Sequence, residues 1–142
     1  VKVLLVGGGN REQDLKKQAK DLKMEEDVII TGKQIGVTKF LDAMDVFMFP
    51  SRSEGFGLSL LEAEANGLPC VVSDRIQPEV KVLNGVLSVN LNEPIQCWVE
   101  AVEEAKRLGR SKTANEILGK KGMSEATCYE TVWKIYNEVL SK

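Results

Sequence analysis

Two glutamates, Glu54 and Glu62, are separated by seven residues, and two glycines lie between them. An apolar run ends at Pro50, a polar loop follows, and an apolar segment of helical composition begins at Leu58. Glycines in such a loop let the backbone approach a ligand closely. The free N–H groups in the first turn of the following helix favour an anion such as a diphosphate. Residues 50–63 are therefore the strongest candidate for a ligand site.

The two carboxylates also have a purely structural interpretation. In it, Glu54 is an exposed loop acid, and Glu62 bonds backbone groups of its surroundings. Glu62 and Glu64 both flank the apolar stripe of the helical segment, so we expect both to be partly buried. A buried carboxylate must find hydrogen-bond donors. Periodicity does not choose between these two residues.

The composition excludes several kinds of catalytic site. The chain has 142 residues and no histidine, which excludes Ser-His, Cys-His and histidine–metal arrangements within it. Its three cysteines, Cys70, Cys97 and Cys128, lie far apart and have neither CxxC nor metal-ligand spacing. We expect them to be reduced thiols in core or half-buried positions, as in a reducing compartment. The sequence therefore predicts no metal site.

Size and charge favour one compact domain, which we assign to residues 1–142. Nineteen basic and 21 acidic side chains give a formal charge of −2, so we expect no nucleic-acid partner. No apolar run approaches the about 20 residues of a membrane span, and the first residues lack the features of a signal peptide. Because the chain opens in a strand-like run at Val1, without an initiator Met, we expect a fragment of a longer protein. We expect that protein to be cytoplasmic.

Short β-branched runs alternate with segments of helical period, which predicts a parallel sheet covered by helices on both faces. The fold class is therefore α/β, a Rossmann-like domain. In such sheets, ligands bind at the carboxyl ends of the strands, here the loops 7–10, 32–36 and 51–57. The predicted strands are 1–6, 27–32, 46–49, 70–73 and 85–89, and the predicted helices are 12–24, 38–44, 58–66, 94–108, 111–122 and 124–140.

Aromatic side chains are expected mainly in the core. Trp98 lies on the apolar stripe of the helix at 94–108. Tyr129, Trp133 and Tyr136 recur at helical spacing in the last helix, together with Leu140, and predict its buried face.

The string EGFGLSLLEA at residues 54–63 closely resembles the E-x7-E motif of the retaining GT-B glycosyltransferases of family 4, also called glycosyltransferase group 1. Segments 4–9, 28–32, 45–51 and 66–74 also resemble that family in order and spacing. The last helix is similar to the family's closing helix. The resemblance covers nearly the whole chain, and it is nearest to enzymes that assemble bacterial capsular polysaccharide or exopolysaccharide.

The resemblance implies the C-terminal, nucleotide-sugar-binding domain of a two-domain transferase. Such an enzyme moves a sugar, with retention, from a UDP- or GDP-linked donor to a glycan or lipid-linked acceptor. Glu54 would contact the transferred sugar as the catalytic residue, and Glu62 would hold the ribose. Carboxylates suit both roles, because they accept hydrogen bonds from vicinal hydroxyl groups. The backbone N–H groups that would meet the sugar and diphosphate belong to Gly55, Phe56, Gly57 and Leu58.

Further contacts follow from the same resemblance. Gly32, Lys33 and Gln34 would border the base, and Gly8 and Arg52 are candidates for base-side or phosphate contacts. Each has an ordinary alternative: a glycine-rich turn is common, GGGN does not complete GxGxxG, and loop cations are often merely exposed. Phe56 has two interpretations, packing within the loop or stacking on a sugar. The resemblance implies neither a cofactor nor a metal, since the family transfers sugar without a bound metal.

The chain departs from the family pattern in two places. The family usually has an upstream strand and helix with a Gly-Arg-x(n)-Lys-Gly pattern, whose Arg and Lys neutralise the diphosphate; the printed sequence begins after them. In the strand order 3-2-1-4-5-6, that strand would lie near the centre of the sheet. We therefore expect strands from another chain, or a sheet that closes up around the gap. Arg75-Ile76 also replaces the glycines of the family's Gly-Gly-x-Pro-Glu turn, before Gln77 and Glu79.

These departures shape the functional expectation. We expect the isolated chain to bind a nucleotide weakly and to transfer nothing unaided. The acceptor would bind through an N-terminal domain outside this sequence, and the full-length protein would associate peripherally with a membrane. The alternative is a non-catalytic nucleotide-binding or protein-interaction domain of the same fold. A dinucleotide-dependent oxidoreductase is disfavoured, because the chain lacks GxGxxG and a suitably spaced acidic residue.

Overall fold

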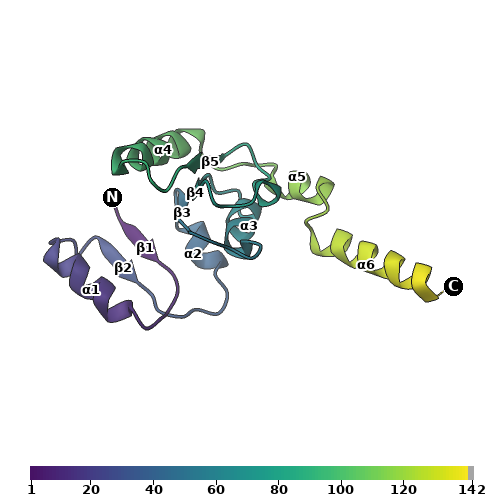
Figure 1. Cartoon of the computed structure of the whole chain (residues 1–142), viewed down its shortest axis with the longest axis horizontal. Helices are drawn as coiled ribbons and strands as arrows, with labels where there is room; N and C mark the ends of the chain where they lie inside the picture. Colours follow the sequence, from purple (N-terminus) through teal and green to yellow (C-terminus); the bar gives the residue numbers. More distant parts are fainter. Residues whose placement is uncertain (141–142) are drawn as a thin grey trace. The chain divides into compact units, whose positions relative to one another are not determined.

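The computed structural model describes residues 1–140, without the side chain of Glu125. The chain forms two compact units that meet in sequence between Met44 and Asp45. In both units the strands run parallel and alternate with helices (Figure 1). This arrangement confirms the predicted α/β class. No helix within residues 1–140 is long and apolar enough to cross a membrane.

The first unit contains two strands and two helices. Strand β1 (Val3–Leu5) pairs in parallel with β2 (Val28–Ile30), and α1 (Glu12–Asp21) connects them. Adjacent parallel strands need a crossover connection of this kind, because a tight turn between them would make them antiparallel. The short helix α2 (Thr38–Asp42) follows.

Charged side chains stabilise the first unit at two places, the start of its sheet and the ends of α1. The Lys2 Nζ atom lies 2.9 Å from Asp27 Oδ1 and joins the starts of the two strands. This hydrogen bond and the lysine's charge hold the pKa of the Asp27 carboxyl below its usual range. In α1, Glu12 and Asp14 occupy the first turn and Lys20 the last, which is the favourable order for the helix dipole.

The second unit is built on a three-stranded sheet in the order β3-β4-β5. The ranges of its elements are β3 (Phe47–Phe49), α3 (Leu58–Ala65), β4 (Cys70–Ser73), the 3-10 turn η1 (Pro78–Val80), β5 (Val86–Val89), α4 (Ile95–Leu108), α5 (Ala114–Lys120) and α6 (Glu125–Leu140). Every residue of β4 is buried, because this strand has a neighbour on each side and helices pack against it.

The core of the second unit lies between this sheet and α4. Val71 of β4, Val89 of β5, and Trp98 and Ala105 of α4 form one buried cluster. The prediction that Trp98 is a core residue is confirmed, since only 6% of its surface is exposed. The core thus fixes the sheet whose carboxyl ends carry the E-x7-E segment.

The sheets differ from the single sheet that the sequence predicts. The strands form two sheets, β1-β2 and β3-β4-β5. In the predicted order, β1 lies beside β2, and β3, β4 and β5 follow one another, with one further strand between β1 and β3. The two observed sheets match the two parts of that order. Within residues 1–140 these strands are not paired into one sheet, so the expected sheet that closes up around the gap is not found there.

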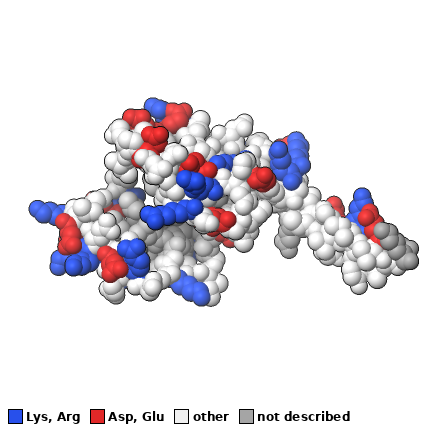
Figure 2. Space-filling model, in the orientation of Figure 1, with Lys and Arg blue, Asp and Glu red and all other residues white. Residues whose placement is uncertain are grey.

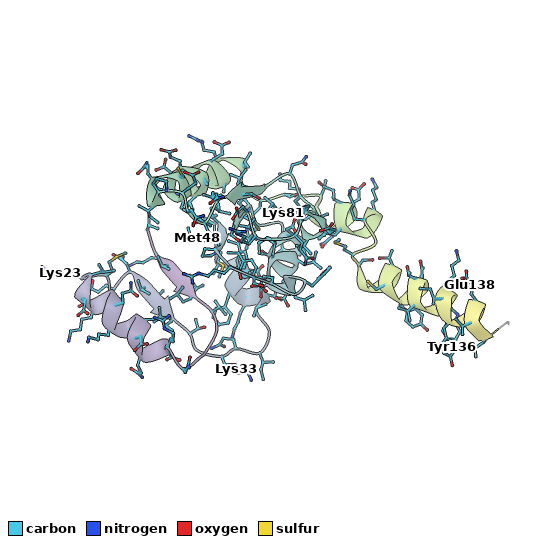
Figure 3. The ribbon with its side chains drawn as sticks, viewed as in Figure 1. Lys23, Lys33, Met48, Lys81, Tyr136 and Glu138 are labelled. Atoms are coloured by element: carbon cyan, nitrogen blue, oxygen red, sulfur yellow. The ribbon has the colours of Figure 1, made fainter. Side chains whose placement is uncertain are left out.

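The expected burial of the last helix is wrong for the structure described. Tyr129, Trp133 and Tyr136 are between 54% and 69% exposed, and Leu140 is 67% exposed. Figure 1 shows α6 leading away from the sheet of its own unit, and Figure 3 shows the Tyr136 side chain pointing out from the helix. The three rings stack on one another along the helix. An amphipathic pattern shows which face is apolar but not that a partner surface covers it.

The cysteines divide by environment. Cys70 is buried in β4 and Cys97 is half-buried on α4, as expected. Cys128 is exposed on α6, which corrects the expectation of a core or half-buried position. The cause is the same as for the aromatic residues, because Cys128 lies on the helix that leaves the core.

Candidate functional site

The E-x7-E segment spans the loop from β3 to α3 and the first turns of α3. Strand β3 ends at Phe49, and Pro50 opens the loop. Gly57 stands at the N-cap of α3 with φ 85° and ψ 42°, a left-handed conformation that glycine adopts without steric cost. The Gly57 carbonyl accepts hydrogen bonds from the N–H groups of Leu60 (2.9 Å) and Leu61 (3.2 Å). The loop therefore turns sharply into the helix.

Glu54 is half-buried within this loop. The hydroxyl of Ser51 donates a hydrogen bond of 2.6 Å to Glu54 Oε1. Within residues 1–140, Oε2 of Glu54 has no hydrogen bond or ion pair. The carboxylate is therefore held through one oxygen, while the other can accept a hydrogen bond from a ligand.

The loop that follows β4 supports the loop that follows β3. The Ser73 hydroxyl at the end of β4 donates to the Ser51 carbonyl at 2.5 Å, and Gln77 Nε2 donates to the Gly55 carbonyl at 3.3 Å. A Cβ atom added at Gly57 would lie 3.8 Å from Val80 Cγ2. These contacts arise because parallel neighbours bring their carboxyl ends to the same edge of the sheet.

The two glutamates of α3 have opposite environments. Glu62 is exposed, so the expectation that it is partly buried is wrong. Glu64 has no exposed surface, and its Oε1 accepts hydrogen bonds from the N–H groups of Val82 (2.8 Å) and Leu83 (2.7 Å). Burial raises the pKa of the Glu64 carboxyl, although the two N–H groups oppose this effect. Glu64 is therefore the structural acid of the helix, and Glu62 is the one available to a ligand.

The remaining residues around the loop are accessible. Phe56 is 46% exposed and Leu58 is 66% exposed, so neither side chain packs fully into the protein. The side chains of Arg52 and Glu79 are also exposed. On the face shown in Figure 2, basic and acidic side chains are interspersed. Within residues 1–140, no group of three or more Cys, Asp or Glu side chains lies close enough together to hold a metal ion.

In the first unit, the backbones of Gly8 and Lys33 lie close together. A Cβ atom at Gly8 would lie 2.9 Å from the Lys33 nitrogen, and the Gly7 N–H donates to the Gly32 carbonyl at 3.1 Å. Gln34 Nε2 donates to the Thr31 carbonyl at 2.8 Å, which fixes its side chain locally. The Lys33 side chain is exposed (Figure 3). Because Gly8 has no side chain, its backbone can lie this close to the backbone of Lys33.

The match to known proteins covers both units. Residues 1–120 match the family model described as glycosyl transferases group 1. The chain belongs to this family.

The curated relatives of this group 1 glycosyltransferase chain are longer proteins. It is 30% identical to EpsF of Bacillus subtilis over 138 residues, 95% of the chain but 36% of EpsF. It is also 30% identical over 143 residues to the O-antigen biosynthesis glycosyltransferase WclY of Escherichia coli, covering 96% of the chain and 40% of WclY. The chain thus spans less than half the length of these relatives.

Solved structures show the same fold. Sucrose-phosphate synthase from Thermosynechococcus elongatus aligns with 99% of the chain and 39% of its own length, at a TM-score of 0.80 and 20% identity. The pneumococcal O-GlcNAc transferase GtfA, solved with UDP and GlcNAc, aligns with 100% of the chain and 30% of its own length, at a TM-score of 0.73 and 22% identity. The group 1 chain therefore shares its parallel-stranded α/β fold with part of each of these two proteins.

Sequence reasoning missed three polar residues that hold the Glu54 loop, namely Ser51, Ser73 and Gln77. Ser51 lies inside the segment that was singled out, but a serine in a loop carries no pattern of its own. Ser73 lies 22 residues further along the chain, and only strand pairing brings the two together. The position of Ser73 at the carboxyl end of a predicted strand was the one available signal.

Proposed function

We propose that the protein containing this chain is a glycosyltransferase, and that this chain supplies its site for a nucleoside-diphosphate sugar. The observation that supports the proposal best is the position of Glu54. Its carboxylate lies in a glycine-containing loop before the N-terminus of α3, held through one oxygen, and within residues 1–140 the other oxygen has no hydrogen-bond partner. That arrangement suits a sugar hydroxyl that must be held next to a diphosphate.

Different residues are proposed to bind the sugar, the ribose and the diphosphate of the donor. Glu54 positions the transferred sugar through a hydrogen bond to a hydroxyl group. Glu62, exposed on α3, accepts hydrogen bonds from the ribose hydroxyls. The N–H groups of Leu58 and Ser59 lie in the first helical turn, where the helix places a partial charge of about +0.5. Two phosphate charges exceed that partial charge, so we propose that the exposed Arg52 also contacts the diphosphate.

The donor and acceptor classes follow from the same proposal. UDP and GDP sugars are the donors, and transfer proceeds with retention and without a metal or organic cofactor. UDP was bound in the structure of GtfA, and the name of WclY places it in O-antigen biosynthesis. We propose a glycan or lipid-linked acceptor in bacterial polysaccharide biosynthesis, bound by residues outside this chain, and a protein at the cytoplasmic face of the membrane. Gly32, Lys33 and Gln34 are the proposed base-side residues.

The test uses the full-length protein and four donors: UDP-glucose, UDP-galactose, UDP-N-acetylglucosamine and GDP-mannose. Release of the nucleoside diphosphate reports turnover. Glu54→Ala is expected to lower kcat by about 10- to 100-fold, the effect of losing a hydrogen bond to a charged group. Glu62→Ala is expected to raise the donor KM by about tenfold with a smaller change in kcat. Glu103→Ala, an exposed acid of α4, is the matched control.

The same variants discriminate the alternative. If Glu54→Ala and Glu103→Ala turn over the donor equally well, the catalytic proposal is wrong and a non-catalytic domain of the same fold is favoured. Retention is tested separately, by the anomeric configuration of the product in its NMR spectrum. An inverted product contradicts that part of the proposal.

A further inference from the structure

The loop that carries Glu54 is tied to the central strand by a side chain where the backbone pairing stops. The β3–β4 ladder ends with the pair Phe49 and Val72. The next residue of β4, Ser73, is fully buried, and its hydroxyl donates to the Ser51 carbonyl at 2.5 Å. Ser51 therefore has a fixed backbone position at the carboxyl edge of the sheet.

The side chain of Ser51 has two acceptors within reach. Its hydroxyl lies 2.6 Å from Glu54 Oε1 and 3.2 Å from the Ser53 carbonyl. A hydroxyl group has only one proton to donate. Hydrogen bonds to an ionised acceptor are shorter and stronger than those to a neutral one. The proton therefore goes to the Glu54 carboxylate, and the contact to Ser53 is secondary.

We propose that Ser51 is a positioning residue for Glu54 in sugar transfer. Ser73 fixes the backbone of Ser51, and the Ser51 hydroxyl in turn fixes Oε1 of the carboxylate. Oε2 then presents a single direction to a hydroxyl of the donor sugar. Without the serine hydroxyl, a half-exposed glutamate in a loop samples several rotamers, and only a fraction of them are productive. This inference rests on the proposed function, because it concerns the same carboxylate.

The geometry separates this role from a purely structural one. The bond from Ser73 ends on the main chain of Ser51, so a substitution of the Ser51 side chain leaves that bond in place. Ser51→Ala therefore removes the hydroxyl from Glu54 while the loop keeps its tie to β4. Ser51→Thr retains a hydroxyl at the same position. Ser53→Ala is a matched control, since it removes a hydroxyl from an exposed residue of the same loop.

The experiment measures nucleoside diphosphate release by the full-length protein, with UDP-glucose, UDP-galactose, UDP-N-acetylglucosamine and GDP-mannose as the donors. For the donor that the wild-type protein uses, Ser51→Ala is expected to lower kcat about tenfold, as for one lost hydrogen bond to a charged group. The donor KM is expected to change less than about threefold, because the proposed ribose and diphosphate contacts do not involve Ser51. Ser51→Thr and Ser53→Ala are expected to stay within about threefold of the wild type.

Two outcomes overturn the inference. If Ser51→Ala is as active as Ser53→Ala, the hydroxyl does not position Glu54. If Ser51→Thr loses as much kcat as Ser51→Ala, or if the loss is accompanied by a lower Tm, the serine acts on the fold and not on the carboxylate.

A parallel Glu54→Gln variant distinguishes failure of this inference from failure of the proposed function. A fully active Glu54→Gln protein, or a wild type that uses none of the four donors, contradicts the proposed function and the inference with it. An impaired Glu54→Gln protein alongside an active Ser51→Ala protein contradicts the inference alone.

Discussion

At the scale of single residues, Glu64 shows how a buried acid differs from a functional one. Its side chain has no exposed surface, and Oε1 accepts two backbone hydrogen bonds from the segment that follows η1. Within the described residues, Glu64 Oε2 is a buried side-chain oxygen without a hydrogen-bond partner. A neutral carboxyl group is less costly in this position than a carboxylate, because desolvation penalises the charge. Glu64 therefore holds a loop in place and does not face a ligand.

Replacing Glu64 is predicted to destabilise the protein according to what replaces it. Glu64→Ala leaves the N–H groups of Val82 and Leu83 without an acceptor and is expected to lower the free energy of unfolding by about 2–4 kcal/mol. Glu64→Gln retains an acceptor oxygen and is expected to cost less than about 1 kcal/mol. Urea denaturation measures both values. Equal losses for the two variants would show that side-chain volume matters and the hydrogen bonds do not.

The raised pKa of Glu64 predicts a pH dependence of stability. In the unfolded chain this carboxyl titrates at its ordinary value, and burial raises the pKa in the folded state. Between the two values the folded protein binds more protons than the unfolded chain, so the free energy of unfolding falls as pH rises. Glu64→Gln lacks this titration. The stability of the wild type relative to this variant is therefore expected to be greatest at and below the ordinary glutamate pKa, about pH 4, and to fall as the pH rises above it. A difference that rises with pH contradicts the burial effect.

At the scale of elements, the two ends of α3 determine where the E-x7-E segment lies. Gly57 precedes the helix as its N-cap and Gly67 follows its C-cap, and both have positive φ angles. Gly67 is also packed tightly, because a Cβ atom there would lie 2.5 Å from the Ser111 carbonyl oxygen. The Gly67 carbonyl accepts a hydrogen bond of 2.8 Å from the Ser111 N–H. The C-terminal end of α3 is thus fixed to the segment before α5.

Gly67→Ala is predicted to be strongly destabilising, for two separable reasons. An alanine at positive φ costs about 1–2 kcal/mol, and the contact with the Ser111 backbone forces the two segments apart. Gly122→Ala is the matched control, since Gly122 has φ 74° but no atom within 4 Å of an added Cβ. Thermal unfolding is expected to show a larger drop in Tm for Gly67→Ala than for Gly122→Ala. Similar drops for both would mean that backbone strain alone accounts for the effect.

At the scale of the whole molecule, the second unit combines a sheet whose central strand is buried with a helix that is largely exposed. The central strand β4 is buried throughout, whereas the aromatic face of α6 is exposed. A large exposed apolar face is uncommon on a monomeric protein surface. The three cysteines differ in exposure in the same way: Cys70 in β4 is buried, Cys97 on α4 is half-buried and Cys128 on α6 is exposed.

The rates of thiol labelling are predicted to follow the exposure of the three cysteines. Cys128 is expected to react first with a disulfide reagent such as DTNB, because its side chain is exposed. Cys97 is expected to react more slowly, since burial and the nearby charges of Glu93 and Glu100 raise its pKa and reduce the thiolate fraction. Cys70 is expected to react only when the protein unfolds, because burial raises its pKa and blocks access. Peptide mapping of the labelled sites measures the order, and early labelling of Cys70 would contradict the buried strand.

Apolar periodicity and the residues that end strands and helices predict the secondary-structure elements well, because secondary structure depends largely on nearby residues. The strand at 70–73 is placed at its observed residues, and the helix at Leu58 begins where a glycine precedes an apolar run. The 3-10 turn η1 is not predicted, since Pro78-Glu79-Val80 has too few residues to show a period. The E-x7-E segment is found from sequence because its residue types and spacing are themselves the signal. Its supporting residues are not, because Ser51 and Ser73 meet only through strand pairing.

The sequence by itself determined the α/β class, the order of the elements, the E-x7-E segment and the resemblance to the glycosyl transferases group 1 family. Only the tertiary structure decided which of Glu62 and Glu64 is buried, since both flank the same apolar stripe and the burial depends on the segment Val82–Leu83 packed against it. It also decided that the apolar face of α6 is exposed in the structure described. Periodicity fixes the direction in which a side chain points from its own element, and only the neighbouring elements determine what it meets there.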